Sequence, residues 1–289
     1  MYRYSLTLDD SAIAFARDNL NETKEKQSEY IQKIRDHFAQ HEQATRITSD
    51  DDVLVAFLRG CKYNLEKTIV KLCKFYKMRS DLPNIFSQRD PMHPRMVELL
   101  SLGAFVPLRK TNDGRIIIII RPACYSPKEF KFEEVLKIGY VVLDVCSKIC
   151  PAMQVYGVCA VFDMKGVGLA HARPMTPTII KHMVHSWENY HCRPKQLEFI
   201  NAPMYISVVL NIFKSFMSAK LKERVRVHFG GNSALHEFVD KAALPEEYGG
   251  EDGKFSQHVD FWRRQVQEYG QWLKFDEQFR VYKDINEET

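Results

Sequence analysis

Two histidines come closest to the spacing of metal ligands. His182 and His185 are three positions apart in the segment TIIKHMVHSWENY, whose apolar residues recur with a helical period. Side chains three residues apart share a helix face, so the pair is placed to share a metal ion. No acidic or thiol partner stands nearby at metal-ligand spacing. Solvated histidines, or histidines at the edge of the core, are therefore the favoured interpretation.

One aspartate stands where α/β enzymes often keep a catalytic acid. Asp163 ends an apolar run that predicts a buried strand, and such enzymes bind ligands at the carboxyl ends of strands. No base or nucleophile accompanies it, so a structural hydrogen-bonding role is favoured. The chain has no Walker loop, GxGxxG or GxSxG motif, and Gly230-Gly231 alone does not cradle a pyrophosphate. We therefore expect no catalytic residue, cofactor or metal.

The composition is that of an ordinary globular protein of 289 residues, with 45% hydrophobic and 27% charged residues. A net charge of +4 argues against a strongly basic nucleic-acid-binding protein but permits a local basic patch. Seven cysteines without CxxC pairs indicate free thiols in a reducing compartment. No apolar run approaches the roughly 20 residues of a membrane span, and the first residues lack a signal-peptide core. We expect a monomeric, cytoplasmic protein.

The first 90 residues are predicted to be helical throughout. Residues 8–43 predict two helices, or one that bends around 19–23. The stretch 48–51, TSDD, starts a helix that ends at Gly60, and Asn64 caps the next one. The following DLPNIFSQRDPMHP has three prolines and no regular period, which predicts a linker.

Strands and helices alternate after this linker. Four segments predict strands: RIIIIIR at 115–121, VYGVCAVFDMKG from 155, QLEFINA from 196 and RVRVHFGG from 224. Helices are expected from Ser126-Pro127 to about Cys150, after Thr176-Pro177, and over VDFWRRQVQEYGQWLKF near the C-terminus. This alternation predicts a mostly parallel sheet that is covered by helices.

The segment 201–226 predicts a helix with an excess of apolar surface. It has two apolar stripes and a basic end: Ile206, Leu210, Phe213 and Met217; Tyr205, Val209, Ile212 and Phe216; and Lys220, Lys222, Arg224 and Arg226. A surface helix needs a single apolar face of about 100°. Two arrangements satisfy the pattern. The helix is buried between two core layers, or it is a lid with one face on a cavity and the other on a membrane.

Three predicted helices, 133–150, 177–190 and 201–226, carry large apolar side chains toward the predicted sheet. Each residue alone is an ordinary core residue, but together they predict a cavity for a lipophilic ligand. The predicted lining consists of Leu136, Gly139, Tyr140, Leu143, Val158, Phe162, Met183, Trp187, Phe199, Ile206, Leu210, Phe213 and Met217.

The chain also resembles the CRAL-TRIO lipid-transfer proteins, in the branch of the tocopherol-transfer, retinaldehyde-binding and clavesin proteins. The resemblance is carried, in family order over about 49–253, by DDVLVAFLRGCKYNLEKTI, VFDMKGVGLAHARPMTP, QLEFINAP, SAKLKERVRVHFGG and LPEEYGG. It implies a helical N-terminal module and an α/β domain that encloses a lipid, with a mobile gate helix at 201–224.

The resemblance further implies a cleft that binds phosphoinositide headgroups and promotes release of the cargo. Its basic positions match Arg193, Lys195, Lys220 and Arg224; a solvated helix end is the competing interpretation. Another basic family position is Cys61 here, with Lys62 beside it. Membrane-facing gate positions match Leu169, Tyr205, Val209 and Ile212, while a further one is occupied by Arg173.

The cargo is less securely implied, because carriers change their pocket residues to change their ligand. Gly139, Tyr140 and Leu143 stand where the tocopherol carrier has polar residues, and Trp187 and Phe213 look bulkier than their counterparts. Tocopherol, a retinoid and another isoprenoid-like lipid all remain open.

We therefore predict an α/β protein with a helical module at 1–90, a mostly parallel CRAL-TRIO lipid-binding domain with a gate helix at 91–255 and a helical extension at 256–289. The expected function is non-catalytic transfer of a hydrophobic small molecule between membranes, with reversible binding to phosphoinositide-containing endosomal or other anionic membranes. The alternative is a phosphoinositide-sensing adaptor in trafficking or signalling, without a dedicated cargo. A hydrolase or dehydrogenase is disfavoured because its motifs are missing.

Overall fold

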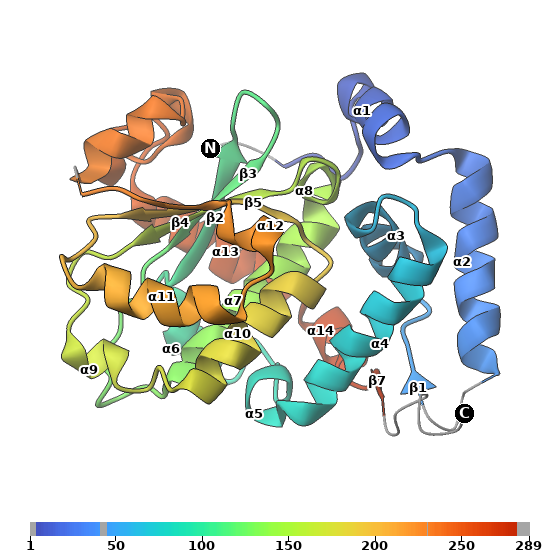
Figure 1. Cartoon of the computed structure of the whole chain (residues 1–289), viewed down its shortest axis with the longest axis horizontal. Helices are drawn as coiled ribbons and strands as arrows, with labels where there is room; N and C mark the ends of the chain where they lie inside the picture. Colours follow the sequence, from blue (N-terminus) through green and yellow to red (C-terminus); the bar gives the residue numbers. More distant parts are fainter. Residues whose placement is uncertain (1–3, 41–44, 230, 282–289) are drawn as a thin grey trace.

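The N-terminal part of the chain is a set of helices beside the main α/β body (Figure 1). The computed structural model describes residues 4–40, 45–229 and 231–281. Predicted segment ends at 41–43, 230 and 282–289 lie outside these residues. The first helices are α1 (Asp10–Leu20), α2 (Lys24–Ala39), α3 (Asp51–Gly60) and α4 (Leu65–Asp81). The residues 8–43 thus contain two helices, and the prediction of helix starts before 51 and after Asn64 is confirmed.

Short polar side chains decide where these helices begin. The side chains of Asp9, Thr23, Asp50 and Asn64 each accept a backbone N–H from the first turn that follows. Each such cap satisfies an otherwise unpaired donor and stabilises the helix by about 1 kcal/mol. Local sequence is therefore enough to fix the boundaries of this region.

The α/β body contains a five-stranded sheet in the order β2-β3-β4-β5-β6. The strands are β2 (Phe105–Lys110), β3 (Ile116–Ile120), β4 (Val158–Asp163), β5 (Pro194–Ile200) and β6 (Val225–Val227). β2 is antiparallel to β3, and the other pairs are parallel. The mostly parallel fold is confirmed, but sequence patterning missed β2, because FVPLRK contains a proline and has a weak strand pattern. A separate antiparallel pair joins β1 (Thr45–Arg46) to β7 (Arg280–Val281).

Helices cover both faces of this sheet. α7 (Phe132–Ile149), α10 (Pro177–Asn189) and α11 (Ile206–Phe216) lie on one side, and the 3-10 helices η1 (Gly231–Glu237), η2 (Lys241–Ala243) and η3 (Glu246–Tyr248) lie on the other (Figure 1). The remaining helices are α5 (Pro83–Phe86), α6 (Pro94–Ser101), α8 (Pro151–Tyr156), α9 (Leu169–Ala172), α12 (Ala219–Lys222), α13 (Phe255–Glu268) and α14 (Gly270–Asp276).

Three predicted element boundaries were wrong. The long helix begins at Phe132 rather than Ser126, because Glu134 accepts the N–H of Lys131 and fixes the start there. Val155 and Tyr156 belong to α8, and Gly157, at a φ of 90°, separates that helix from β4. The predicted helix 201–226 is two helices, α11 and α12, since Met217 and Ser218 are extended between them.

The segment predicted as a linker carries a buried charge. Arg89 is 1% exposed, and its guanidinium pairs with Asp144 of α7 and with Asp276 of α14, the latter at 3.0 Å. Arg79 of α4 reaches the same Asp276 carboxylate at 2.8 Å. This four-residue group, the buried ion network, ties the N-terminal helices and the C-terminal helices to α7. The domain boundaries predicted at 90 and 255 stay predictions.

The buried ion network also sets a pH dependence. Burial raises the pKa of Asp144, but the adjacent Arg89 and His191 outweigh it and hold the pKa well below its usual range. A carboxylate with a depressed pKa in the fold contributes stability above the ordinary carboxyl pKa. That contribution is lost as the pH falls through its folded pKa.

Replacing Arg89 by methionine should lower the free energy of unfolding by about 3–5 kcal/mol, because it leaves Asp144 as an uncompensated buried charge. Urea denaturation measures this loss. The control is Asp90→Asn, which removes an exposed ion pair of Asp90 with Lys274 and should cost less than about 1 kcal/mol. Equal small losses for both variants would contradict the role assigned to the network.

Candidate functional site

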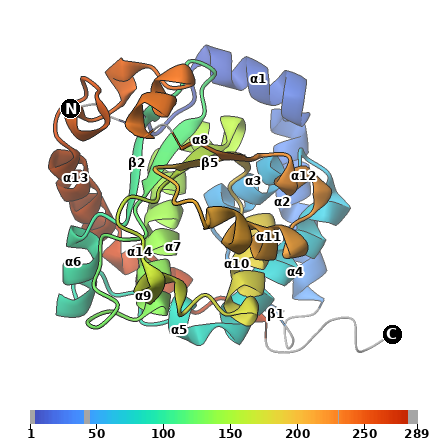
Figure 2. The ribbon, with the colours of Figure 1, turned by 60° about the vertical axis from the view of Figure 1, so that its left-hand side comes forward.

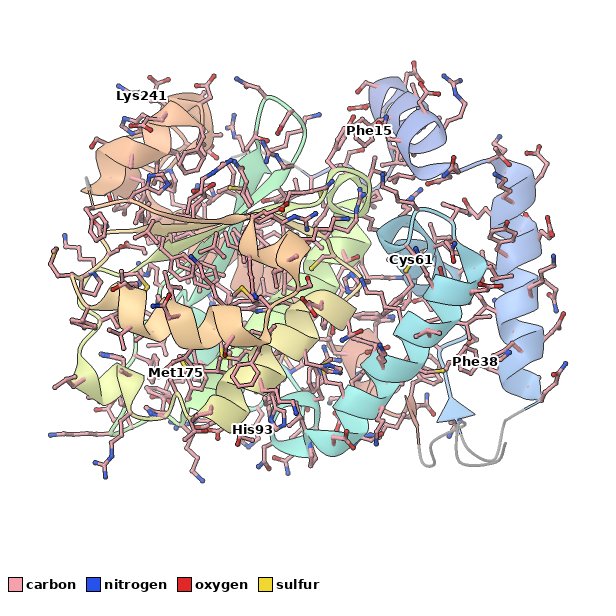
Figure 3. All side chains as sticks on the ribbon, in the orientation of Figure 1. Phe15, Phe38, Cys61, His93, Met175 and Lys241 are labelled. Atoms are coloured by element: carbon pink, nitrogen blue, oxygen red, sulfur yellow. The ribbon has the colours of Figure 1, made fainter. Side chains whose placement is uncertain are left out.

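An apolar cavity of about 170 Å³ lies between the sheet and the helices α7, α10 and α11. Twelve of the thirteen residues predicted to line a cavity do line it, and Met217 does not: it is buried at the end of α11. Sequence reasoning missed further lining residues, among them Phe105, Ile118, Ile120 and the Met175 labelled in Figure 3. The alternation of a strand carried a signal for Ile118 and Ile120, because residues two apart share a face.

Four aromatic rings cross from the sheet to α11. Phe199 of β5 stacks on Phe162 of β4, with centroids 4.5 Å apart, and Phe162 contacts Trp187 of α10 at 5.9 Å. Trp187 in turn stacks on Phe213 of α11 at 5.7 Å. Such contacts contribute about 0.5–1.5 kcal/mol each beyond the area they bury. α11 is thus held over the cavity by aromatic packing.

Most polar groups around the cavity form hydrogen bonds with other groups of the protein. The hydroxyl of Tyr140 bonds Ser186, that of Tyr190 donates to Asp144, and that of Tyr205 donates to the carbonyl of Val167. Arg121 lines the cavity, but its guanidinium lies over the Phe255 ring and donates to the Leu102 carbonyl.

Two lining groups are exceptions. Within the described part of the chain, the indole N–H of Trp187 and the hydroxyl of Tyr125 form no hydrogen bond with a protein group. The site therefore offers an almost wholly apolar wall with one or two hydrogen-bonding positions.

The other candidate residues do not assemble into a catalytic or metal site. Asp163 accepts hydrogen bonds from Asn201 at 2.7 Å and from Tyr248 at 2.9 Å, which occupies its carboxylate structurally. His185 bonds Asn189 of its own helix, and the described residues contain no cluster of three or more residues suited to a metal. None of the described helices combines the length and the hydropathy needed to cross a bilayer.

The two apolar stripes of 201–226 differ in their exposure. Ile206, Leu210, Phe213 and Met217 are 3–7% exposed, whereas Ile212 and Phe216 are 39% and 37% exposed. Tyr205, predicted to face outward, is 41% exposed and also lines the cavity. Val209 of the same stripe is partly buried and lines the cavity as well. Leu169 is 83% exposed, and the outer face further includes Met204 and Val208, which sequence reasoning missed.

Residues 100–250 match the family model described as CRAL/TRIO domain, and these residues make up about half of the chain. The chain belongs to the CRAL/TRIO domain family. A second family model, described as Pinta-like, UBA domain, matches residues 23–96. Homologues in the CRAL/TRIO family are lipid-binding and lipid-transfer proteins rather than enzymes, and they bind hydrophobic ligands.

Relatives of this CRAL/TRIO protein match most of its length. The human protein named alpha-tocopherol transfer protein-like is 26% identical over 253 residues, covering 87% of this chain and 73% of that one. Rat clavesin-1 is 24% identical over 249 residues, covering 84% and 69%. The crystal structure of Sfh5 shares the fold, with a TM-score of 0.51 at 14% identity, over 75% of this chain and 81% of that one.

The CRAL/TRIO domain and the N-terminal helices together form a basic cluster: Lys62, Arg193, Lys195, Lys220 and Arg224. Burial lowers the pKa of Lys195, and the other four cations lower it further, to about 8. Burial and the proximity of Arg224 likewise lower the pKa of Arg193 to about 10. No carboxylate of a described residue forms an ion pair with these five side chains. Lys62, which follows Cys61 in the sequence, supplies one of these positive charges.

Backbone geometry holds two of these cations in place. Arg193 donates to the carbonyl of Val155, and Arg224 donates to that of Pro194. Gly157 lies against Arg193 and Lys195, because a Cβ there would be 2.6 Å from the Arg193 carbonyl oxygen and 2.8 Å from Cγ of Lys195. The close approach of β5 to the start of β4 thus requires a glycine.

Replacing Lys62 by glutamine should raise the pKa of Lys195, since it removes one of the positive charges that disfavour the protonated form. NMR titration of the lysine side-chain resonances measures this change. Lys67→Gln, at an exposed position of α4, is the control and should leave the titration of Lys195 where it is. A Lys195 pKa that does not respond to Lys62→Gln would rule out electrostatic contact between the loop after α3 and β5.

Proposed function

We propose that this protein binds a neutral, hydrophobic small molecule in the cavity and transfers it between membranes without catalysing a reaction. The observation that carries the proposal is the position of α11. Its inner face closes an apolar cavity, while its outer face exposes Ile212, Phe216 and Val208. A wall that is apolar on both sides suits a lid that opens against a membrane, because either face loses little by contact with hydrocarbon.

The lining favours a neutral cargo. A phosphate or carboxylate inside the cavity would need a cation as a partner, and the guanidinium of Arg121, which lines the cavity, is turned onto Phe255. The unpaired indole N–H of Trp187 suits a single hydroxyl or carbonyl oxygen of the ligand. Tocopherol, a retinoid and another isoprenoid-like lipid all satisfy this description.

The outer face supports reversible docking on a membrane. Leu169, Met204 and Val208 are 64–86% exposed and stand on α9, on the loop before α11 and on α11 itself. Exposed apolar groups of this kind mark interaction surfaces. We place the protein in the cytoplasm, as a monomer that binds endosomal or other anionic membranes.

The basic cluster supports release by phosphoinositides. Its five cations repel one another in the absence of an anion, so a multiply charged headgroup would relieve that repulsion and form charge-assisted hydrogen bonds. Headgroups promote release only if they bind the open form better than the closed one. Lys220 belongs to α12, which follows α11 directly, so the cluster is suited to sense the position of the gate.

Organic extraction of the purified protein, followed by mass spectrometry, should yield a stoichiometric neutral lipophile. The variant Ala160→Leu fills the cavity from β4 and should lower binding of retinol, a fluorescent isoprenoid alcohol, by at least tenfold while the protein stays folded by circular dichroism. A protein that extracts empty and does not bind retinol, but still binds phosphoinositide vesicles, would favour the adaptor function instead.

Charge reversal of Lys220 and Arg224 to glutamate should weaken binding to vesicles that contain phosphatidylinositol bisphosphate and slow transfer of retinol, without unloading the protein. Vesicle sedimentation measures binding, and fluorescence measures transfer. The control reverses Lys241 and Lys254, two exposed lysines, of which Lys241 lies far from Cys61 (Figure 3). Unchanged vesicle binding by the first double variant would contradict the assignment of the cluster.

A further inference from the structure

The junction between α11 and α12 is held from outside by one side chain. Met217 and Ser218 have extended backbone angles, so the helical hydrogen bonds are interrupted there. Ser218 donates its backbone N–H to Oε1 of Glu188 at 2.9 Å, across 30 residues of sequence. Glu188 lies near the C-terminal end of α10, the helix that α11 crosses (Figure 2).

Trp187, the residue before Glu188, contacts α11 from the cavity side. Trp187 stacks on Phe213 with an interplanar angle of 13°, one turn before the junction. Two consecutive residues of α10 therefore hold α11, one through an apolar contact within the cavity and the other through a hydrogen bond at its rim.

The charge of Glu188 is not committed to a cation. No lysine or arginine of a described residue forms an ion pair with it, although it lies close enough to the amine of Lys71 to favour the protonated form there. The positive charge of Arg193, a member of the basic cluster, in turn lowers the pKa of Lys71. The Glu188 carboxylate accepts the N–H of Ser218, which is two residues before Lys220 of the cluster, and within the described residues it forms no other hydrogen bond.

We propose that Glu188 is a positioning residue that latches the gate, and that a polyanion bound to the basic cluster releases this latch by repelling the carboxylate. The inference rests on the proposed function. It adds a physical link between the headgroup site and the lid, through one hydrogen bond at a junction whose extended residues absorb the change in backbone angles. By linkage, a closed latch weakens headgroup binding as much as the headgroup weakens the latch.

Three variants separate the contact from the charge. Glu188→Ala removes the acceptor, and Glu188→Gln keeps an acceptor but removes the charge. Ser218→Pro removes the donor at little cost to the backbone, because Ser218 has a φ of −60° and Met217 before it is extended. Asn189→Ala is the control, since that side chain bonds only to His185 of its own helix.

Hydrogen–deuterium exchange of the full-length protein tests the latch without any cargo. Glu188→Ala and Ser218→Pro should exchange about fivefold faster over 206–222, the factor expected for one typical hydrogen bond. Glu188→Gln and Asn189→Ala should match the unsubstituted protein. Inositol trisphosphate should speed exchange of that segment in the unsubstituted protein but not in Glu188→Gln.

Unchanged exchange in both Glu188→Ala and Ser218→Pro would overturn the latch. Equal acceleration of the unsubstituted protein and Glu188→Gln by inositol trisphosphate would overturn the repulsion. Failure of the unsubstituted protein to bind retinol would instead count against the carrier function, and the exchange result would stand independently of it.

Discussion

The guanidinium of Arg89 is buried between Asp144 and Asp276, and this arrangement connects α7 to the N-terminal and C-terminal helices through side chains. Because Arg79 shares Asp276, two positive charges meet two negative ones in a region from which water is excluded. The desolvation cost of each charge is offset only while the other three are present. The N-terminal helices, α7 and the C-terminal helices therefore hold their mutual position as a unit.

The buried ion network makes α7 and α11, the helices on either side of the cavity, unequal in how firmly they are held. α7 is anchored through Asp144 to buried charges that do not separate without a large penalty. α11 is held by aromatic and aliphatic contacts, whose loss is largely compensated wherever other hydrocarbon replaces them. The molecule thus combines a firmly anchored wall with a more easily separated one, which suits the proposed release of a cargo without unfolding.

Local sequence signals predicted much of this structure. Capping residues located the N-terminal helices, and apolar runs located four strands. Nine of the twelve correctly predicted lining residues lie on the helices α7, α10 and α11, and the other three lie on β4 and β5. Structural features that depend on residues distant in the sequence were not predicted. The segment around Arg89 resembles a linker because its prolines are visible in the local sequence. The partners with which Arg89 forms ion pairs, however, lie 55 and 187 residues away in the chain. Met217 continues the inward stripe on a helical wheel, but the helix ends before this residue. The wheel therefore wrongly placed Met217 in the cavity lining.

Gly157 has no side chain, yet it constrains the positions of the charged residues beside it. Its backbone angle and the 2.6 Å approach to the Arg193 carbonyl oxygen leave no room for a side chain. Lysine and arginine both carry the charge that the neighbouring cluster supplies. Among diverged descendants of this chain, position 157 should therefore outlast the cluster. A lineage that abandons anion binding is free to lose its lysines and arginines, but it must keep this glycine for as long as it keeps the sheet.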